Sequence, residues 1–163
     1  MYRPPPASGY RALRKGRVSV PHHAYLVTAV VAEREPRFQH RTTAEAAAGA
    51  LTQNALWTSS RLLCWVLMPD HLHALVQLGA GEPLHALVRR MKCNTAAAAN
   101  RADGRTGAVW TTGYHDRAIR GEHQLQSAAR YIIANPLRAG LVESISEYPY
   151  WGDIWFDRRS LDL

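Results

Sequence analysis

Hydrophobic positions along this chain follow two periods, one typical of strands and one typical of helices. Residues 24–31 and 62–68 are nearly continuous apolar runs with several β-branched or aromatic residues, which predicts two buried strands. Residues 71–78 form a third run directly after a Pro-Asp pair, which is typical of turns, so the second and third runs predict an antiparallel hairpin. Residues 109–119 alternate well enough to predict a last strand.

Two helices are predicted between these strands. Thr42 and Glu45 have the spacing of a capping box and open an Ala-rich stretch, which predicts a helix that runs to about Trp57. Pro83 suits the first turn of a second helix, and the apolar residues after it recur at helical spacing. These apolar residues are Leu84, Leu87, Val88 and Met91.

The clearest helical pattern lies near the C-terminal end. From Gln124 the apolar residues fall at i, i+3, i+4, i+7 and i+8, until Pro136 obliges the helix to stop or kink near Asn135. The first six predicted elements match the split βαβ arrangement called ferredoxin-like. We therefore expect an α+β fold, a βαββαβ antiparallel sheet with an additional C-terminal helix, in one domain over residues 21–163 after a basic arm of residues 1–20.

Composition supports a single globular domain with a preference for polyanions. The chain has 163 residues, of which 47% are hydrophobic and 20% charged, which is ordinary for a folded domain. Twenty Lys and Arg residues against 13 Asp and Glu give a formal net charge of +7. Such a surplus is expected of a nucleic-acid-binding protein, although a merely basic protein is the alternative.

Two groups of basic residues are candidate phosphate contacts. The first lies in the N-terminal arm, where no acidic residue precedes Glu33, and includes Arg11, Arg14, Lys15 and Arg17. The second lies on the polar face of the second helix and consists of Arg89, Arg90, Lys92 and Arg101. An ordinary solvent-exposed helix face is the alternative explanation for this second group.

Several other classes of protein are disfavoured. Cys64 and Cys93 belong to no CxxC pattern, which argues against a zinc cluster or a disulfide framework. No run of about 18 apolar residues occurs, and the Pro-rich start lacks the apolar segment of a signal peptide. We therefore expect a cytoplasmic protein that does not contact a membrane.

The sequence His71-Leu72-His73 is the first candidate for chemistry. On a strand, the two histidines project from the same face, because side chains alternate with period two. Two neutral imidazoles at this spacing can hold a divalent metal ion and leave its other positions open. Two polar residues on the solvated face of a half-buried strand are the alternative.

The last predicted helix carries a second candidate group. Gln124, Ser127, Tyr131 and Asn135 form one polar stripe beside the apolar face, and the last two are i, i+4 neighbours that can reach a common site. A tyrosine that merely covers the edge of the sheet is the alternative reading of this helix alone.

Three motifs in order carry a resemblance to a known family. They are WVLMPDHLH at residues 65–73, WTTGYHD at 110–116 and YIIANPLRAGLV at 131–142. With these motifs the chain, from about Tyr25 to about Trp151, resembles the REP-associated tyrosine transposases, which are single-tyrosine members of the HUH nuclease group. The three motifs together are specific, whereas HLH alone would not be.

The resemblance implies a set of roles for the matching positions. His71 and His73 would bind Mg²⁺ or Mn²⁺, Tyr131 would be the nucleophile, and Asn135 would be a third metal ligand at a place that is typically Gln in related insertion-sequence transposases. The expected partner is single-stranded or hairpin DNA of repetitive extragenic palindromes, cleaved through a covalent 5′-phosphotyrosine, in a bacterial protein that acts as a monomer. Further expected DNA contacts are Tyr114, which could stack on a base, Arg117 and Arg138.

Two other functions are compatible with the same residues. A non-catalytic DNA-binding module would keep the basic surface but form no covalent adduct with DNA. A metal-dependent hydrolase that uses water as nucleophile would stay active in Tyr131→Phe.

Overall fold

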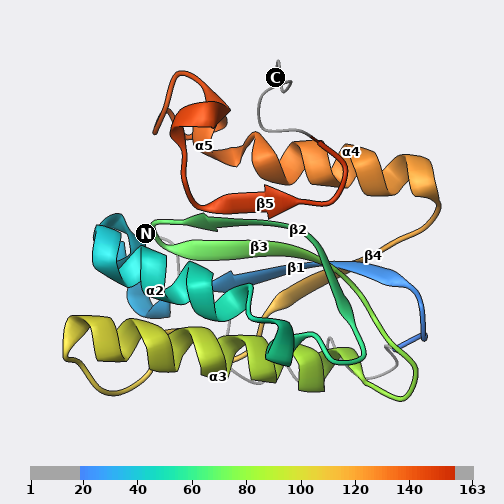
Figure 1. Ribbon diagram of the computed structural model, residues 1–163, viewed down its shortest axis with the longest axis horizontal. Helices are drawn as coiled ribbons and strands as arrows, with labels where there is room; N and C mark the ends of the chain where they lie inside the picture. Colours follow the sequence, from blue (N-terminus) through green and yellow to red (C-terminus); the bar gives the residue numbers. More distant parts are fainter. Residues whose placement is uncertain (1–18, 157–163) are drawn as a thin grey trace, which may run out of the picture.

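The computed structural model describes residues 19–156, which form a five-stranded sheet between two layers of helices (Figure 1). All strand pairs are antiparallel, in the order β4-β1-β3-β2-β5. The first four strands have the ferredoxin-like order, so the predicted α+β fold is confirmed. The elements are β1 (Ala24–Val30), α2 (Arg41–Leu51), β2 (Arg61–Met68), β3 (His71–Gln77), α3 (Leu84–Asp103), β4 (His115–Ile119), α4 (Glu122–Ile133), α5 (Asn135–Arg138) and β5 (Trp151–Asp153).

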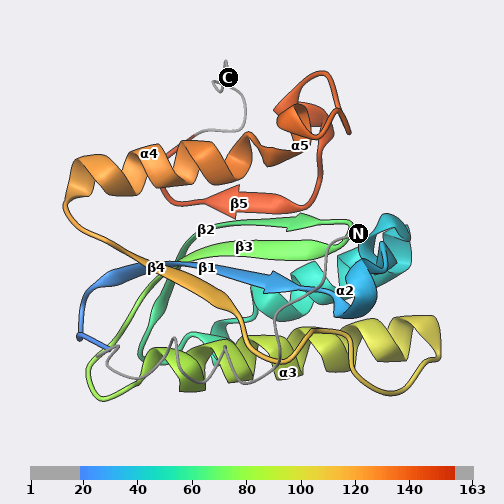
Figure 2. The same cartoon turned by 180° about the vertical axis from the view of Figure 1, so that it is seen from behind.

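The two helical layers bury different faces of the sheet. Helices α2 and α3 pack together on one face, and α4 crosses the other (Figures 1 and 2). In β3, Leu72 and Ala74 belong to the core beneath α2 and α3, whereas Leu75 belongs to the core beneath α4. Because strand side chains alternate, His71 and His73 lie on the α4 face. Within residues 19–156, none of the helices is long and apolar enough to cross a membrane.

The β2–β3 hairpin forms as the sequence predicts. Met68 pairs with His71 across a turn that consists of Pro69 and Asp70 alone. On its other side β3 pairs with β1, and this register sets Thr28 opposite His73. The two histidines therefore lie on an inner strand, where neighbours on both sides fix the backbone that carries them.

The first helix is shorter than predicted. Helix α2 ends at Leu51, and the predicted remainder is a loop that includes a short 3₁₀ turn at Asn54–Leu56. The Thr52 hydroxyl donates to the carbonyl oxygens of Ala48 and Gly49, and the Trp57 indole N–H donates to that of Leu51, so the last carbonyl groups are satisfied without further helix.

The predicted capping box is also wrong. Helix α2 begins at Arg41, one residue before Thr42, and its N-cap residue, His40, makes no side-chain capping hydrogen bond. Glu45 instead accepts a hydrogen bond from Arg41 at 2.7 Å on the exposed face of the helix. This i, i+4 ion pair competes with the local contact that the capping-box pattern requires.

The last predicted strand is divided, and one strand was not predicted. Only His115–Ile119 forms β4, while Trp110 makes an isolated bridge with Val31, because Gly113, with φ of 87°, turns the chain between them. Strand β5 was missed because three residues are too short for a periodic pattern. It pairs with the edge of β2, where a Cβ on Gly152 would lie 2.8 Å from Nε1 of Trp65.

Candidate active site

The two histidines of β3 each have a fixed orientation. Their ring centroids are 4.8 Å apart in a T-shaped arrangement, and both side chains are half-buried. Nδ1 of His71 lies 2.6 Å from the Asp70 carboxylate, and Nδ1 of His73 lies 2.8 Å from the Thr28 hydroxyl. Arg34 donates to the other carboxylate oxygen of Asp70 at 3.1 Å, so a chain of contacts holds the first histidine.

The surroundings of the site favour a neutral imidazole at His73 and a charged carboxylate at Asp70. Burial first, and then the nearby charges of His71 and Arg138, lower the pKa of His73 to about 4. Burial alone would raise the pKa of Asp70, but the hydrogen bonds and charges of His71 and Arg34 outweigh it and lower that pKa. At neutral pH, His73 is therefore an uncharged imidazole, the form that binds metal ions.

The donor set fits a divalent ion bound by two imidazoles. Because the Asp70 carboxylate can only accept at neutral pH, Nδ1 of His71 donates to it, and Nε2 is left as the nitrogen that could bind an ion, as in carboxylate–histidine–metal sites. In the described part of the chain, no three His, Cys, Asp or Glu side chains are grouped as a metal site. The other positions of an ion bound by the two imidazoles would be open to further ligands, such as the oxygens of a substrate.

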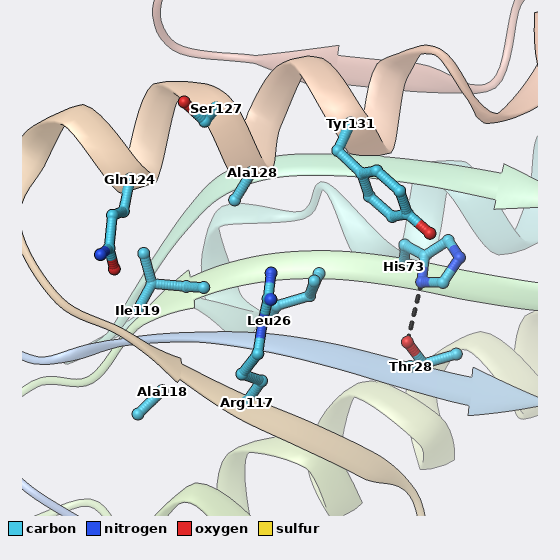
Figure 3. Close-up of a pocket in the computed structure, with 10 residues that line it drawn as sticks. All are labelled: Leu26, Thr28, His73, Arg117, Ala118, Ile119, Gln124, Ser127, Ala128 and Tyr131. Atoms are coloured by element: carbon cyan, nitrogen blue, oxygen red, sulfur yellow. Dashed lines mark hydrogen bonds between the residues drawn. The ribbon is translucent and has the colours of Figure 1, made fainter.

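Tyr131 lies on α4 and shares a pocket with one of the histidines. This Tyr131 pocket has a volume of about 640 Å³ and lies between α4 and the strands β1 and β4 (Figure 3). The Tyr131 side chain is 51% exposed, and its ring points from the helix toward the His73 side of the pocket. Thr28, His73, Arg117, Gln124, Ser127 and Tyr131 contribute its polar lining.

The four residues of the predicted polar stripe do not all face the same site. Gln124, Ser127 and Tyr131 line the pocket, but the Asn135 amide donates to the carbonyl oxygens of Tyr131 and Ile132. Its side-chain oxygen accepts a hydrogen bond from Arg138 at 2.9 Å. The role of Asn135 as a third metal ligand stays a prediction.

Arg138 is placed beside the tyrosine. The carbon at the centre of its guanidinium group lies 4.0 Å from the centroid of the Tyr131 ring, a cation–π contact. It also lies close enough to His73 to lower the pKa of that imidazole. Arg138 thus brings a positive charge to the group formed by the tyrosine and the histidine.

The other predicted DNA contacts fall in different places. Arg117 lines the Tyr131 pocket, whereas Tyr114 lines a second pocket that shares only Thr28 with it. Arg89, Arg90 and Lys92 lie on α3, across the sheet from the histidines. The arm residues Arg11, Arg14, Lys15 and Arg17 lie outside the described residues.

Two of the four Lys and Arg residues on α3 have structural partners that bear on this prediction. Arg90 donates to the Leu56 carbonyl and pairs with Glu82, and the Lys92 ammonium donates to the carbonyl oxygens of Thr111 and Gly113. Their contact with DNA stays a prediction, and Arg89 and Arg101 are the exposed members of the group.

Sequence reasoning missed the partners that orient the histidines. Thr28 is a polar residue in an otherwise apolar strand, and only the register of β1 against β3 places it opposite His73. Asp70 was assigned to the turn alone, although its position next to His71 was visible. Arg34 could not be identified, because its contact with Asp70 spans 36 residues.

The fold and the site together define a ferredoxin-like domain with a pair of histidines on an inner strand and an exposed tyrosine on a covering helix. The Transposase IS200-like family model matches residues 19–135, which is most of the described chain. The chain belongs to this family of IS200-like transposases. The matched segment includes both histidines, Tyr131 and Asn135.

Individual relatives agree with this assignment. The chain is 27% identical over 94 residues to a candidate REP-associated tyrosine transposase of Haemophilus influenzae, which covers 52% of the chain and 53% of that protein. It is 25% identical over 87 residues to the REP-associated tyrosine transposase of Escherichia coli, covering 53% of the chain and 50% of that protein. The chain thus spans about half the length of the curated relatives that it matches.

A solved structure confirms the fold. It is that of a REP-associated tyrosine transposase bound to a REP hairpin, and it matches with a TM-score of 0.64 and 20% sequence identity. The match covers 83% of this chain and 79% of the other.

Proposed function

We propose that this protein is a metal-dependent single-strand DNA endonuclease and strand transferase that uses Tyr131 as its nucleophile. The observation that carries the proposal is the pocket in which Tyr131 of α4 and His73 of β3 meet. The family assignment supports transposase activity in general, and the shared pocket supports the proposal that these two side chains take part in the chemistry.

The reaction is a transesterification. The Tyr131 oxygen attacks the scissile phosphorus and gives up its proton, a new O–P bond forms, and the bond from phosphorus to the 3′ oxygen breaks. The products are a 5′-phosphotyrosine and a strand whose 3′ oxygen takes up a proton. A 3′-OH of another strand can reverse the step, so rejoining needs no external energy source.

The residues of the site would have different roles in this reaction. His71 and His73 would hold Mg²⁺ or Mn²⁺, which when bound supplies a Lewis acid for the phosphate oxygens. Arg117 and Arg138 lie close enough to the pocket to contact the substrate phosphates. The exposed position of Tyr131 leaves its hydroxyl accessible to a DNA strand in the pocket.

The proposed substrate is a hairpin-forming repeat with a single-stranded flank. The names of both curated relatives and of the solved hairpin complex support this substrate class. We further propose that the protein acts as a monomer in the bacterial cytoplasm. A stem would supply shape and phosphates, while an unpaired strand can bring its backbone close to the side chains that line a pocket.

The test is the formation of a covalent adduct. Labelled hairpin DNA with single-stranded flanks and Mn²⁺ should give an SDS-resistant adduct with the wild type and none with Tyr131→Phe. Tyr114→Phe is the matched control, because it removes one hydroxyl from the neighbouring pocket, and it should retain adduct formation. An adduct that survives in Tyr131→Phe, or that mass spectrometry maps to Tyr114, would contradict the proposal.

A further inference from the structure

A second pocket lies next to the Tyr131 pocket, at the end of β1. This Tyr114 pocket has a volume of about 320 Å³. Besides two valines, the residues that line it are Tyr114, Thr28, Thr111, Thr112, His115 and Arg34. This volume is large enough to hold one flat heterocycle.

The Tyr114 pocket touches the candidate metal site in two ways. Thr28 lines both pockets and is hydrogen-bonded to His73 at 2.8 Å. Arg34 lines the Tyr114 pocket and donates to Asp70, whose other oxygen lies 2.6 Å from Nδ1 of His71. An occupant of this pocket would therefore contact Thr28, which touches His73, and Arg34, which reaches His71 only through Asp70.

The wall of the pocket is held in place before any ligand binds. The Lys92 ammonium donates to the carbonyl oxygens of Thr111 and Gly113 at 2.7 and 2.8 Å. The backbone N–H of Thr111 donates to the carbonyl oxygen of Val30 at 2.8 Å, which joins the wall to the end of β1. A wall that is already ordered lowers the conformational-entropy cost of binding a ligand.

The turn that carries Arg34 is held in an unusual conformation. Glu33 and Arg34 both have positive φ angles, of 57° and 53°, which are uncommon for residues other than glycine. The Arg34 side chain is 69% exposed and contacts Asp70 through Nη1. A guanidinium group can pair with a phosphate as well as with a carboxylate, because it presents five N–H donors.

We propose that the Tyr114 pocket binds the nucleotide that adjoins the scissile phosphate, with its base against the Tyr114 ring and its phosphate against Arg34. The inference rests on the proposed function, since it places the scissile phosphate between Tyr131 and the histidines. The nucleotide on the other side of that phosphate then occupies the Tyr131 pocket, beside Arg117 and Gln124. Thr28 marks the boundary between the two positions.

The pocket chemistry favours a single-stranded nucleotide. A base that is unpaired can be turned out against an aromatic ring, and every base has a face for this contact, so the stack binds without strong sequence preference. Thr111 and Thr112 also line the pocket, and a threonine hydroxyl can hydrogen-bond to a base edge. Arg34 adds a contact that depends on salt.

The test uses the fluorescence of 2-aminopurine, which is quenched on stacking. Tyr131→Phe protein, which binds but does not cleave, is mixed with hairpin oligonucleotides that carry 2-aminopurine at each flank position in turn. Quenching should occur at a position next to the phosphate that the wild type cleaves. Introducing Tyr114→Leu should abolish it and weaken binding roughly 5- to 150-fold, whereas Tyr114→Phe should keep it.

A second substitution, at Thr112, tests the pocket independently in case Tyr114→Leu fails to fold. Thr112 is exposed and lines the pocket, so Thr112→Trp should fill the pocket and abolish the quenching, while Thr112→Ala should retain it. Arg34→Gln should flatten the salt dependence of binding by about 0.7 log units per decade of salt. Arg41→Gln, which removes another exposed arginine from a carboxylate pair, should leave that dependence unchanged.

The outcomes separate this inference from the proposed function. One outcome is that the wild type forms a tyrosine adduct while Tyr114→Leu and Thr112→Trp show the same quenching as the unsubstituted pocket. This outcome would reject the Tyr114 pocket as the nucleotide site and would still support the proposed nuclease. Quenching that depends on Tyr114, in a protein whose wild type makes no adduct, would support the pocket and reject the nuclease. Quenching only two or more nucleotides from the cleaved phosphate would also overturn the proposed position.

Discussion

Asp70 connects His71, the first histidine of the site, to Arg34. One carboxylate oxygen accepts from Nδ1 of His71 and the other from Arg34. The backbone around it is also fixed, since the Asp70 carbonyl accepts from the N–H of Val31 and the Pro69 carbonyl from that of Phe38. The orientation of the His71 imidazole therefore depends on a residue that would not itself bind the metal ion.

A substitution series at this position tests that dependence. Asp70→Ala removes the acceptor for Nδ1 of His71 and should weaken Mn²⁺ binding about 10- to 100-fold, the usual effect of losing such a partner. Asp70→Asn keeps an acceptor oxygen and should retain most of the affinity. Calorimetric titration with Mn²⁺ measures both, and His71→Ala, which removes a proposed ligand, should bind more weakly than either. Equal affinity in Asp70→Ala and the wild type would contradict the orienting role.

At the scale of elements, α4 covers only part of its face of the sheet. Its buried residues Ala128, Ala129, Ile132 and Ile133 pack over β2, while Tyr131 is left beside the open part of β1 and β4. Strand β5 extends the covered part, because it pairs with β2 and its Trp151 is buried in the same core. The position of the tyrosine thus depends on how these two elements dock.

Two glycine substitutions test the close contact between β5 and β2. Gly152→Ala would place a methyl group 2.8 Å from Nε1 of the buried Trp65 and should lower the free energy of unfolding by about 1–3 kcal/mol. Gly49→Ala is the matched control, because Gly49 lies on an exposed helix face with nothing within 4 Å of the added carbon. It should stabilise the protein by about 0.5–1 kcal/mol. Urea unfolding measures both, and a Gly152→Ala protein as stable as the wild type would contradict the packing.

At the scale of the whole molecule, positive charge is spread over more than the site. The two proposed nucleotide positions account for Arg34 and Arg117, and Arg138 lies beside Tyr131, yet the sequence carries 20 Lys and Arg residues and a net charge of +7. The N-terminal arm holds five of them before any acidic residue: Arg3, Arg11, Arg14, Lys15 and Arg17. Affinity for a hairpin longer than two nucleotides is therefore expected to draw on charges outside the pockets.

Deletion of residues 1–17 tests the contribution of the arm. Each phosphate contact that is lost should flatten the slope of log affinity against log salt by about 0.7 on a single strand or 0.9 on a duplex stem. Fluorescence anisotropy with hairpin DNA at several salt concentrations gives this slope. A slope equal to that of the full chain would show that the arm makes no phosphate contact.

The sequence by itself determined the features that depend on near neighbours. The alternation around His71 and His73 placed both on one face, and the spacing from Gln124 placed Tyr131 beside the apolar face of its helix, because periodicity is a local property. The order of elements then matched the ferredoxin-like arrangement, as the sheet confirms. The capping box and the length of α2 were wrong because tertiary and side-chain contacts overrode local preference.

Only the tertiary structure decided which distant groups meet. The docking of α4 on the histidine face brings Tyr131 and His73 to one pocket, and strand register brings Thr28 to His73. The contact of Arg34 with Asp70, the short strand β5 and the Tyr114 pocket likewise join segments far apart in the chain. Such contacts depend on how buried faces pack against one another, and no periodic pattern within a single segment encodes them.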